Sequence, residues 1–244
     1  MLRTENLTKR FGGLTAVERV NIALYPGEVV GLVGENGAGK STLIKLLSGV
    51  YQPDEGRIFF RGREVRFLSP RQAREMGIET VYQDLALVEN MDVSANIFMG
   101  RELVRYHLGG LVKVLDRRGM DREAARLLAE LDIPLPSLRG KIKNLSEGQR
   151  RAVALARALR WKARLLLLDE PTTALSLPEQ IKVRELIRTL SQEGTAVLVV
   201  SHDPADIFSV AGRIMVMRHG RVGEERRLEE TSRQEIAALL NSVS

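Results

Sequence analysis

The chain has 244 residues, 44% of them hydrophobic and 28% charged, which is the composition of a globular protein with one large domain and room for a small inserted one. It contains no cysteine, which excludes disulfides and thiolate metal sites. The longest apolar stretches are strand-sized and no apolar signal segment opens the chain, so we expect a protein on the cytoplasmic side.

The charge balance is basic, with 37 Lys and Arg against 31 Asp and Glu, a formal charge of +6 and a pI near 9.8. Such a balance is compatible with nucleic acid or an anionic membrane face. The arginines are scattered, however, with few aromatic residues between them, and this argues against a platform for stacking single-stranded bases. We expect solvated helices and strand edges, and no nucleic-acid partner.

The first part of the chain reads as strands and helices in turn. The sequence "EVVGLVG" (28–34) predicts a buried strand, and "STLIKLLSG" (41–49) predicts a helix closed by a glycine. The alternating sequence "GRIFFRGREV" (56–65) predicts an edge hairpin, and "GIETVYQ" (77–83) predicts another strand.

The pattern between residues 85 and 148 is helical, as in "DREAARLLAELDI" (121–133), and we interpret this all-helical middle as an insertion. Strands and helices alternate again after it, which predicts a mainly parallel sheet. The expected elements are a helix from 145, a strand at 164–169, a helix at 178–193, a strand at 195–201, a helix at 204–211 and a hairpin through His219-Gly220.

The segment "GENGAGKST" (34–42) fits the phosphate-binding pattern G-x-x-x-x-G-K-[ST] and lies between a predicted strand and a predicted helix, as that pattern requires. Glycines let successive N–H groups face the phosphates, Lys40 supplies a positive charge, and the Ser41 hydroxyl is suited to Mg²⁺. A glycine turn that caps a helix is the alternative. The predicted ATP-binding residues here are Gly34, Asn36, Gly37, Ala38, Gly39, Lys40, Ser41 and Thr42.

Polar residues follow three other predicted strands. "RLLLLDEP" (164–171) ends in Asp169, suited to hold Mg²⁺, and Glu170, suited to polarise an attacking water. Without other motifs, an Asp-Glu pair after a strand would indicate an exposed loop. Together with the phosphate-binding motif, the pair instead indicates a metal and catalytic site. His202 and Gln83 each follow a predicted strand, at the carboxyl edge where parallel sheets bind ligands. Considered as single residues, however, both would be interpreted as surface positions.

The segment "NLSEGQRRAVALARALR" (144–160) predicts a helix with Ser146 as its N-cap. The N-terminus of a helix attracts anions, because its N–H groups and dipole point outward. This stretch has no lysine at its turn, so it forms only half of a phosphate site.

These motifs, in this order, resemble the ATP-binding cassette (ABC) ATPases over nearly the whole chain. The resemblance implies an α/β fold, in which a P-loop NTPase core of RecA-like, mainly parallel sheet carries an antiparallel β subdomain. The core would comprise residues 1–84 and 150–244, and a helical subdomain with the LSEGQ signature would comprise 85–149.

The resemblance also gives the half-site a role. In the family the signature binds the γ-phosphate of ATP held by a second subunit, which implies that Ser146, Gly148 and Gln149 contact ATP in trans. The chain would act as a head-to-tail homodimer or with a second cassette. Glu147 stands where the family often has Gly, and its carboxylate must point away from the phosphate.

Other family roles transfer by position. Phe11 matches the aromatic residue that stacks on adenine, although a core phenylalanine is an alternative. Glu170 matches the catalytic carboxylate, His202 the switch histidine, and Gln83 the residue that joins the core to the helical subdomain and reaches the metal and the water. The implied cofactors are ATP and Mg²⁺, the latter held by Ser41, Gln83 and Asp169. A Ser replaces the usual Asp at position 176, so coupling between the two sites is expected to differ.

Three stretches, 33–62, 81–102 and 200–223, resemble the ATPases that energise import of ribose, xylose and fructose. This branch implies ATP hydrolysis that drives import of a small solute, most simply a monosaccharide. It also implies a membrane permease docked near Gln83 and residues 87–98, an extracytoplasmic sugar-binding protein, and a peripheral location on the cytoplasmic face of the cell membrane.

The alternative is an ABC-type ATPase that acts on nucleic acid or the ribosome. A DNA-maintenance ATPase would need a long coiled-coil or zinc insertion, and a translation-associated one normally has two P-loops. The middle segment is too short for a coiled coil and has no cysteine for zinc, and the chain has one P-loop. It also has no Asn-Lys-x-Asp run of the kind that reads guanine.

Overall fold

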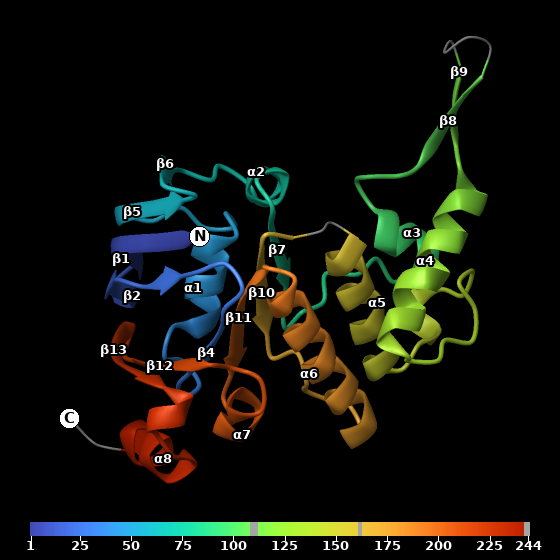
Figure 1. The fold of residues 1–244 in the computed structure, drawn as a ribbon. Helices are drawn as coiled ribbons and strands as arrows, with labels where there is room; N and C mark the ends of the chain where they lie inside the picture. The colour runs from blue at the N-terminus through green and yellow to red at the C-terminus, as the bar shows by residue number, and fades with distance from the viewer. Residues whose placement is uncertain (108–111, 161–162, 242–244) are drawn as a thin grey trace. The chain divides into compact units, whose positions relative to one another are not determined.

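The computed structural model describes residues 1–107, 112–160 and 163–241, and the chain forms two compact units (Figure 1). The core unit comprises residues 1–83, 163–172 and 184–244, and the helical unit comprises residues 84–162 and 173–183. Some residues of the two predicted domains, 108–111, 161–162 and 242–244, lie outside the described residues.

The units differ from the predicted domains after residue 149. Helix α5 (Glu147–Arg160), which is predicted to belong to the core from residue 150, packs against α3 (Val93–Phe98) and α4 (Arg117–Leu131) of the helical unit. The buried apolar side chains of α5 are mostly alanines, together with Val153 and Leu155. The segment 173–183 joins the same unit, because Leu175 and Glu179 approach Gly148 closely.

A six-stranded sheet forms the centre of the core unit, in the order β13-β12-β4-β11-β10-β7. The first five strands in chain order run parallel, and only β13 is antiparallel to its neighbour, which confirms the predicted mainly parallel sheet. The strands are β4 (Val29–Val33), β7 (Ile78–Val81), β10 (Leu165–Asp169), β11 (Ala196–Ser201), β12 (Arg213–Arg218) and β13 (Arg221–Arg227). Strands β4, β10 and β11 are buried along their whole length, as expected of apolar strands covered on both faces.

A second, antiparallel sheet of the core unit contains the N-terminus. Its strands are β1 (Leu2–Phe11), β2 (Leu14–Val20), β3 (Ala23–Leu24), β5 (Glu55–Phe60) and β6 (Arg63–Val65). The predicted hairpin is β5–β6, and both turn residues have positive φ, 54° at Arg61 and 78° at Gly62. Two such residues match the twist of a hairpin.

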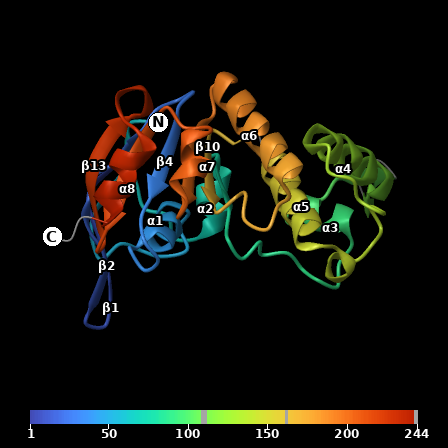
Figure 2. The same ribbon diagram turned by 90° about the horizontal axis from the view of Figure 1, so that it is seen from below.

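Helix α1 (Lys40–Leu47) joins the two sheets of the core unit into one hydrophobic core, which includes Leu43 and Leu47 of the helix and side chains from both sheets. The remaining helices of this unit are α2 (Pro70–Glu75), α7 (Pro204–Phe208), α8 (Arg233–Asn241) and the second half of α6 (Leu177–Gln192). Helix α8 packs on α7 and β12 (Figure 2). Within the six-stranded sheet, β11 pairs in parallel with both β4 and β10, so the carboxyl ends of these three strands lie side by side.

The helical unit contains a hairpin that the sequence analysis did not predict. Strands β8 (Val104–His107) and β9 (Val112–Leu115) pair antiparallel and extend from α3 and α4 (Figure 1). The prediction of an all-helical middle is therefore wrong at this point, because three valines within eight paired residues favour strands. In the described ranges, no helix has the length and apolar composition needed to cross a membrane.

Candidate functional site: a phosphate loop at the carboxyl ends of three strands

The loop of residues 34–39 connects β4 to α1 and curls through positive φ angles, 83° at Gly37 and 105° at Gly39. Its two glycines are used differently. A Cβ at Gly39 would lie 2.2 Å from the backbone oxygen of Ala16, whereas a Cβ at Gly37 would have no atom within 4 Å. Gly39 is therefore required by close packing, and Gly37 keeps the inner side of the loop open.

This contrast gives a paired prediction. We expect Gly39→Ala to lower the free energy of unfolding by about 2 kcal/mol or more, because backbone strain adds to a clash with a backbone atom. Gly37→Ala introduces backbone strain but no clash, so we expect it to lower the free energy of unfolding by about 1 kcal/mol. Chemical denaturation measures both. Equal losses would contradict the difference in packing.

The Lys40 side chain occupies the loop. Its Nζ donates to the backbone oxygens of Gly34, at 2.6 Å, and Glu35, at 2.8 Å. Burial lowers the pKa of this ammonium, and the nearby carboxylates of Glu170 and Asp169 act in the opposite direction. The lysine is thus a partly desolvated cation that can attract phosphate, and the two acids near it are suited to a metal cation rather than to an anion.

Asp169 is buried at the end of β10. Burial raises the pKa of its carboxyl group, and a hydrogen bond from the Ser41 hydroxyl lowers it in part. A hydroxyl group of α1 and a carboxylate at the end of β10 thus meet next to Lys40. Groups of three or more His, Cys, Asp or Glu side chains arranged for a metal do not occur in the described part of the chain.

Glu170 and His202 form a close pair. Glu170 Oε1 accepts a hydrogen bond from the His202 backbone N–H at 2.9 Å and lies 2.8 Å from His202 Nδ1. The glutamate is 7% exposed and has a φ of 54°, whereas the histidine side chain is 59% exposed. The pair therefore has one fixed member and one that solvent or a ligand can reach.

Three other residues of the core unit, Phe11, Thr42 and Gln83, were predicted to bind ATP or to serve catalysis and metal binding. Phe11 ends β1, is 43% exposed and packs edge-on against Tyr51 with ring centroids 5.2 Å apart. A residue exposed to this degree is not part of the core. No sequence motif marks Tyr51 as the ring that packs against Phe11. Gln83 is exposed, and Thr42 is partly buried in α1.

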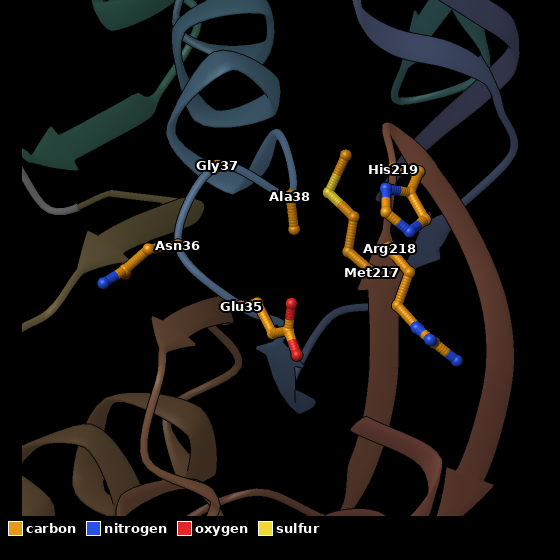
Figure 3. A pocket seen from close by; sticks show the side chains of 7 residues that line it. All are labelled: Glu35, Asn36, Gly37, Ala38, Met217, Arg218 and His219. Carbon is orange, nitrogen blue, oxygen red and sulfur yellow. The ribbon is translucent and has the colours of Figure 1, made fainter. Parts of the chain in front are cut away.

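A small cavity of about 90 Å³ lies beside the phosphate loop (Figure 3). Glu35 and Ala38 face it from the loop, and Met217, Arg218 and His219 line its other side, whereas Asn36 points away. The β12–β13 turn supports the loop here, because the Gly220 N–H donates to the Ala38 carbonyl oxygen at 2.9 Å.

The signature residues lie in the helical unit. Ser146 and Gln149 form a reciprocal capping box at the start of α5, in which the Gln149 N–H donates to Ser146 Oγ at 3.2 Å and the Ser146 N–H donates to Gln149 Oε1 at 3.1 Å. Gly148 is buried, and a Cβ there would lie 3.3 Å from Leu175 and from Glu179. The predicted N-cap is confirmed.

The two departures from the family pattern have local structural roles. Glu147 is exposed, and its carboxylate lies 3.7 Å from the Arg151 guanidinium one helical turn further on. Ser176 precedes α6, and both its N–H and its hydroxyl donate to Glu179 Oε2, at 2.8 and 2.7 Å. Ser176 therefore helps to start a helix.

A phosphate loop at the end of β4, two acids at the end of β10 and a histidine after β11 define a nucleoside-triphosphatase of the P-loop class. The model of the family described as ABC transporter matches residues 17–173. The chain belongs to this family, in which it is an ATP-binding cassette with ATPase activity.

The xylose/arabinose import ATP-binding protein of Sulfolobus acidocaldarius is 43% identical over 244 residues, which are 100% of this chain and 95% of that protein. The fructose import ATP-binding protein of Rhizobium meliloti is 41% identical over 91% of this chain and 86% of its own length. A ribose import ATP-binding protein of Rubrobacter xylanophilus is 42% identical, and this chain spans 43% of it.

Solved structures of ABC cassettes are similar over nearly the whole chain. A dimeric, post-hydrolysis cassette bound to ADP and Pi has a TM-score of 0.81 and 26% identity, with 93% of this chain and 99% of that chain covered. A nucleotide-free cassette from an ABC transporter has a TM-score of 0.81 and 27% identity, with 99% and 95% covered. The expected ABC ATPase fold is thus confirmed.

Proposed function

We propose that this chain hydrolyses ATP on the cytoplasmic face of the membrane and thereby drives a permease that imports a monosaccharide. The observation that supports a monosaccharide as the imported solute is the full-length similarity to a protein named for xylose and arabinose import. The fructose and ribose import relatives point to the same class of solute.

The proposed site roles follow from the contacts in the core unit. The loop amides and Lys40 hold the ATP phosphates, with Gly34, Asn36, Gly37, Ala38, Gly39, Ser41 and Thr42 forming the rest of the cradle. Phe11 offers an exposed ring for the adenine. Glu170 polarises the attacking water and His202 contacts the γ-phosphate, a division supported by their different exposure.

Magnesium fits the donors present, because Ser41 and Asp169 bring a hydroxyl and a carboxylate oxygen together. Gln83 would supply a third oxygen. When bound, Mg²⁺ would neutralise phosphate charge. The Ser146, Gly148 and Gln149 of a second copy, or of another cassette, would close the site with a helix N-terminus. A capping box leaves the remaining first-turn N–H groups available for this contact.

The Asp169 carboxylate gives a pH-dependent prediction. Because burial raises its pKa, the ionised form disfavours folding, and this loss of stability develops as pH rises from the ordinary Asp pKa through the raised one. We expect Asp169→Asn to raise the melting temperature of the nucleotide-free protein at pH 7. The gain should vanish near pH 3.5, and the Mg²⁺ dependence of ATP binding should be lost.

Asp54→Asn is the matched control with the opposite sign. The Arg10 backbone N–H and the Lys9 ammonium hold the pKa of Asp54 below its usual range. Its replacement should therefore lower the melting temperature at pH 7 and leave the Mg²⁺ dependence intact. Thermal melts between pH 3.5 and 7 check both variants, and a lower melting temperature for Asp169→Asn at pH 7 would contradict the prediction.

The transport assignment is tested by affinity purification of the tagged Glu170→Gln chain from detergent-solubilised native cells with ATP present. We expect a membrane-spanning permease in the eluate, together with a sugar-binding protein of the same system. Lys40→Met serves as the control that lacks ATP binding. Ribosomal or DNA-repair proteins, without a membrane protein, would overturn the transport assignment and leave the ATPase assignment standing.

A further inference from the structure

The loop that follows Glu170 is under backbone strain. Glu170 has a φ of 54°, a conformation that costs an ordinary side chain about 1 kcal/mol or more and persists only where neighbouring contacts fix it. One such contact is made by the backbone of Glu170 itself, whose N–H donates to the Val200 carbonyl oxygen at 2.9 Å. The segment after Glu170 needs a second anchor.

Thr172 provides this anchor. It is 4% exposed, and its hydroxyl donates to Asp206 Oδ2 at 2.7 Å. Asp206 lies in α7, the helix that begins directly after the His202 segment. Thr172 and Asp206 thus connect the chain just after the glutamate to the chain just after the histidine.

Two further groups hold the Asp206 carboxylate in place. Arg184 of α6 donates from Nη2 to Asp206 Oδ1 at 2.7 Å, so the two carboxylate oxygens have separate partners. The hydroxyl of Ser201, the buried residue before His202, lies 3.5 Å from Oδ2 and also accepts the Asp203 N–H at 3.0 Å. Charge-assisted hydrogen bonds of this kind are short and strong.

We propose that Thr172, Asp206 and Arg184 form a positioning clamp that fixes the Glu170–His202 pair in its reactive geometry. The proposal rests on the proposed function, because it requires Glu170 to be the catalytic carboxylate. None of the three side chains needs to touch ATP. They act on the rate through the position of Glu170, since small displacements of a catalytic group reduce rates strongly.

The test compares three hydroxyl variants of purified protein by steady-state ATP hydrolysis and thermal melting. Thr172→Val removes the hydroxyl and retains the shape, and we expect kcat to fall about tenfold with the KM for ATP within about twofold. Thr172→Ser keeps the hydroxyl and should restore kcat. Thr189→Val removes an exposed hydroxyl from α6, where it donates to the Glu185 carbonyl oxygen, and should change neither parameter.

A double variant separates this clamp from the assignment of Glu170. If the clamp acts through Glu170, then Glu170→Gln combined with Thr172→Val should hydrolyse ATP no more slowly than Glu170→Gln alone. Full turnover by Glu170→Gln would overturn the proposed function itself. If Glu170→Gln is inactive but Thr172→Val turns over within about twofold of the unmodified protein, or Thr172→Ser fails to restore kcat, the clamp is overturned and the proposed function stands.

Discussion

Glu170→Gln is expected to reduce kcat for ATP hydrolysis by about 10³-fold and to leave ATP binding intact. The reason is that Gln keeps the volume of the side chain, and so its place beside His202, but removes the carboxylate that accepts a proton from water. Phosphate release measures turnover, and calorimetric titration with ATP measures affinity.

Glu185→Gln is the matched control, because Glu185 is an exposed carboxylate on α6 within the same unit. It should retain full turnover. A Glu170→Gln protein that releases phosphate within tenfold of the unmodified rate would remove Glu170 from the catalytic role.

Lys40→Met is expected to weaken ATP binding by about 10²-fold, because charge-assisted contacts to phosphate contribute about 1.5–3 kcal/mol each. The variant should remain folded. Burial lowers the pKa of Lys40, so the charged form disfavours the nucleotide-free fold, and its removal should not lower the melting temperature.

Lys182→Met is the control for loss of a lysine. Lys182 pairs with Asp132 in the helical unit, away from the loop in the sequence. ATP should protect this variant against thermal unfolding as it protects the unmodified protein, and should protect Lys40→Met very little. Equal protection of both variants would contradict the role of Lys40.

The sequence best predicts the site residues that follow buried parallel strands. Lys40, Asp169, Glu170 and His202 meet because β4, β10 and β11 are neighbours in the sheet, and each residue follows a continuous apolar run. Their order in the chain, with the signature, was enough to indicate the family.

Other features depend on tertiary packing that no local pattern reveals. Asp206 looks like an ordinary first-turn acid of a short helix, and only the fold places it against Thr172 and Arg184. The β8–β9 hairpin is short and exposed, so its strand signal is weak beside the strong periodicity of α4. The predicted boundary at residue 150 likewise depended on the packing face of α5.

The roles of Ser176 and Glu147 follow from the same local physics. Both the N–H and the hydroxyl of Ser176 donate to Glu179 Oε2, so α6 can begin normally without the acid that is usual in the family. The exposed Glu147 beside Arg151 adds a pair of opposite charges one turn apart on α5. Neither substitution requires a change in the helix that it starts.

The most direct test of the account is whether two chains share each ATP, measured by sedimentation of the Glu170→Gln protein with and without ATP. We expect a dimer only with ATP, and a monomer when Ser146→Asp is added, because Asp caps α5 as well as Ser does but repels phosphate. Ser69→Asp, at the N-cap of α2, is the matched control and should still dimerise. A protein that stays monomeric with ATP, or dimerises equally well with Ser146→Asp, would contradict the account.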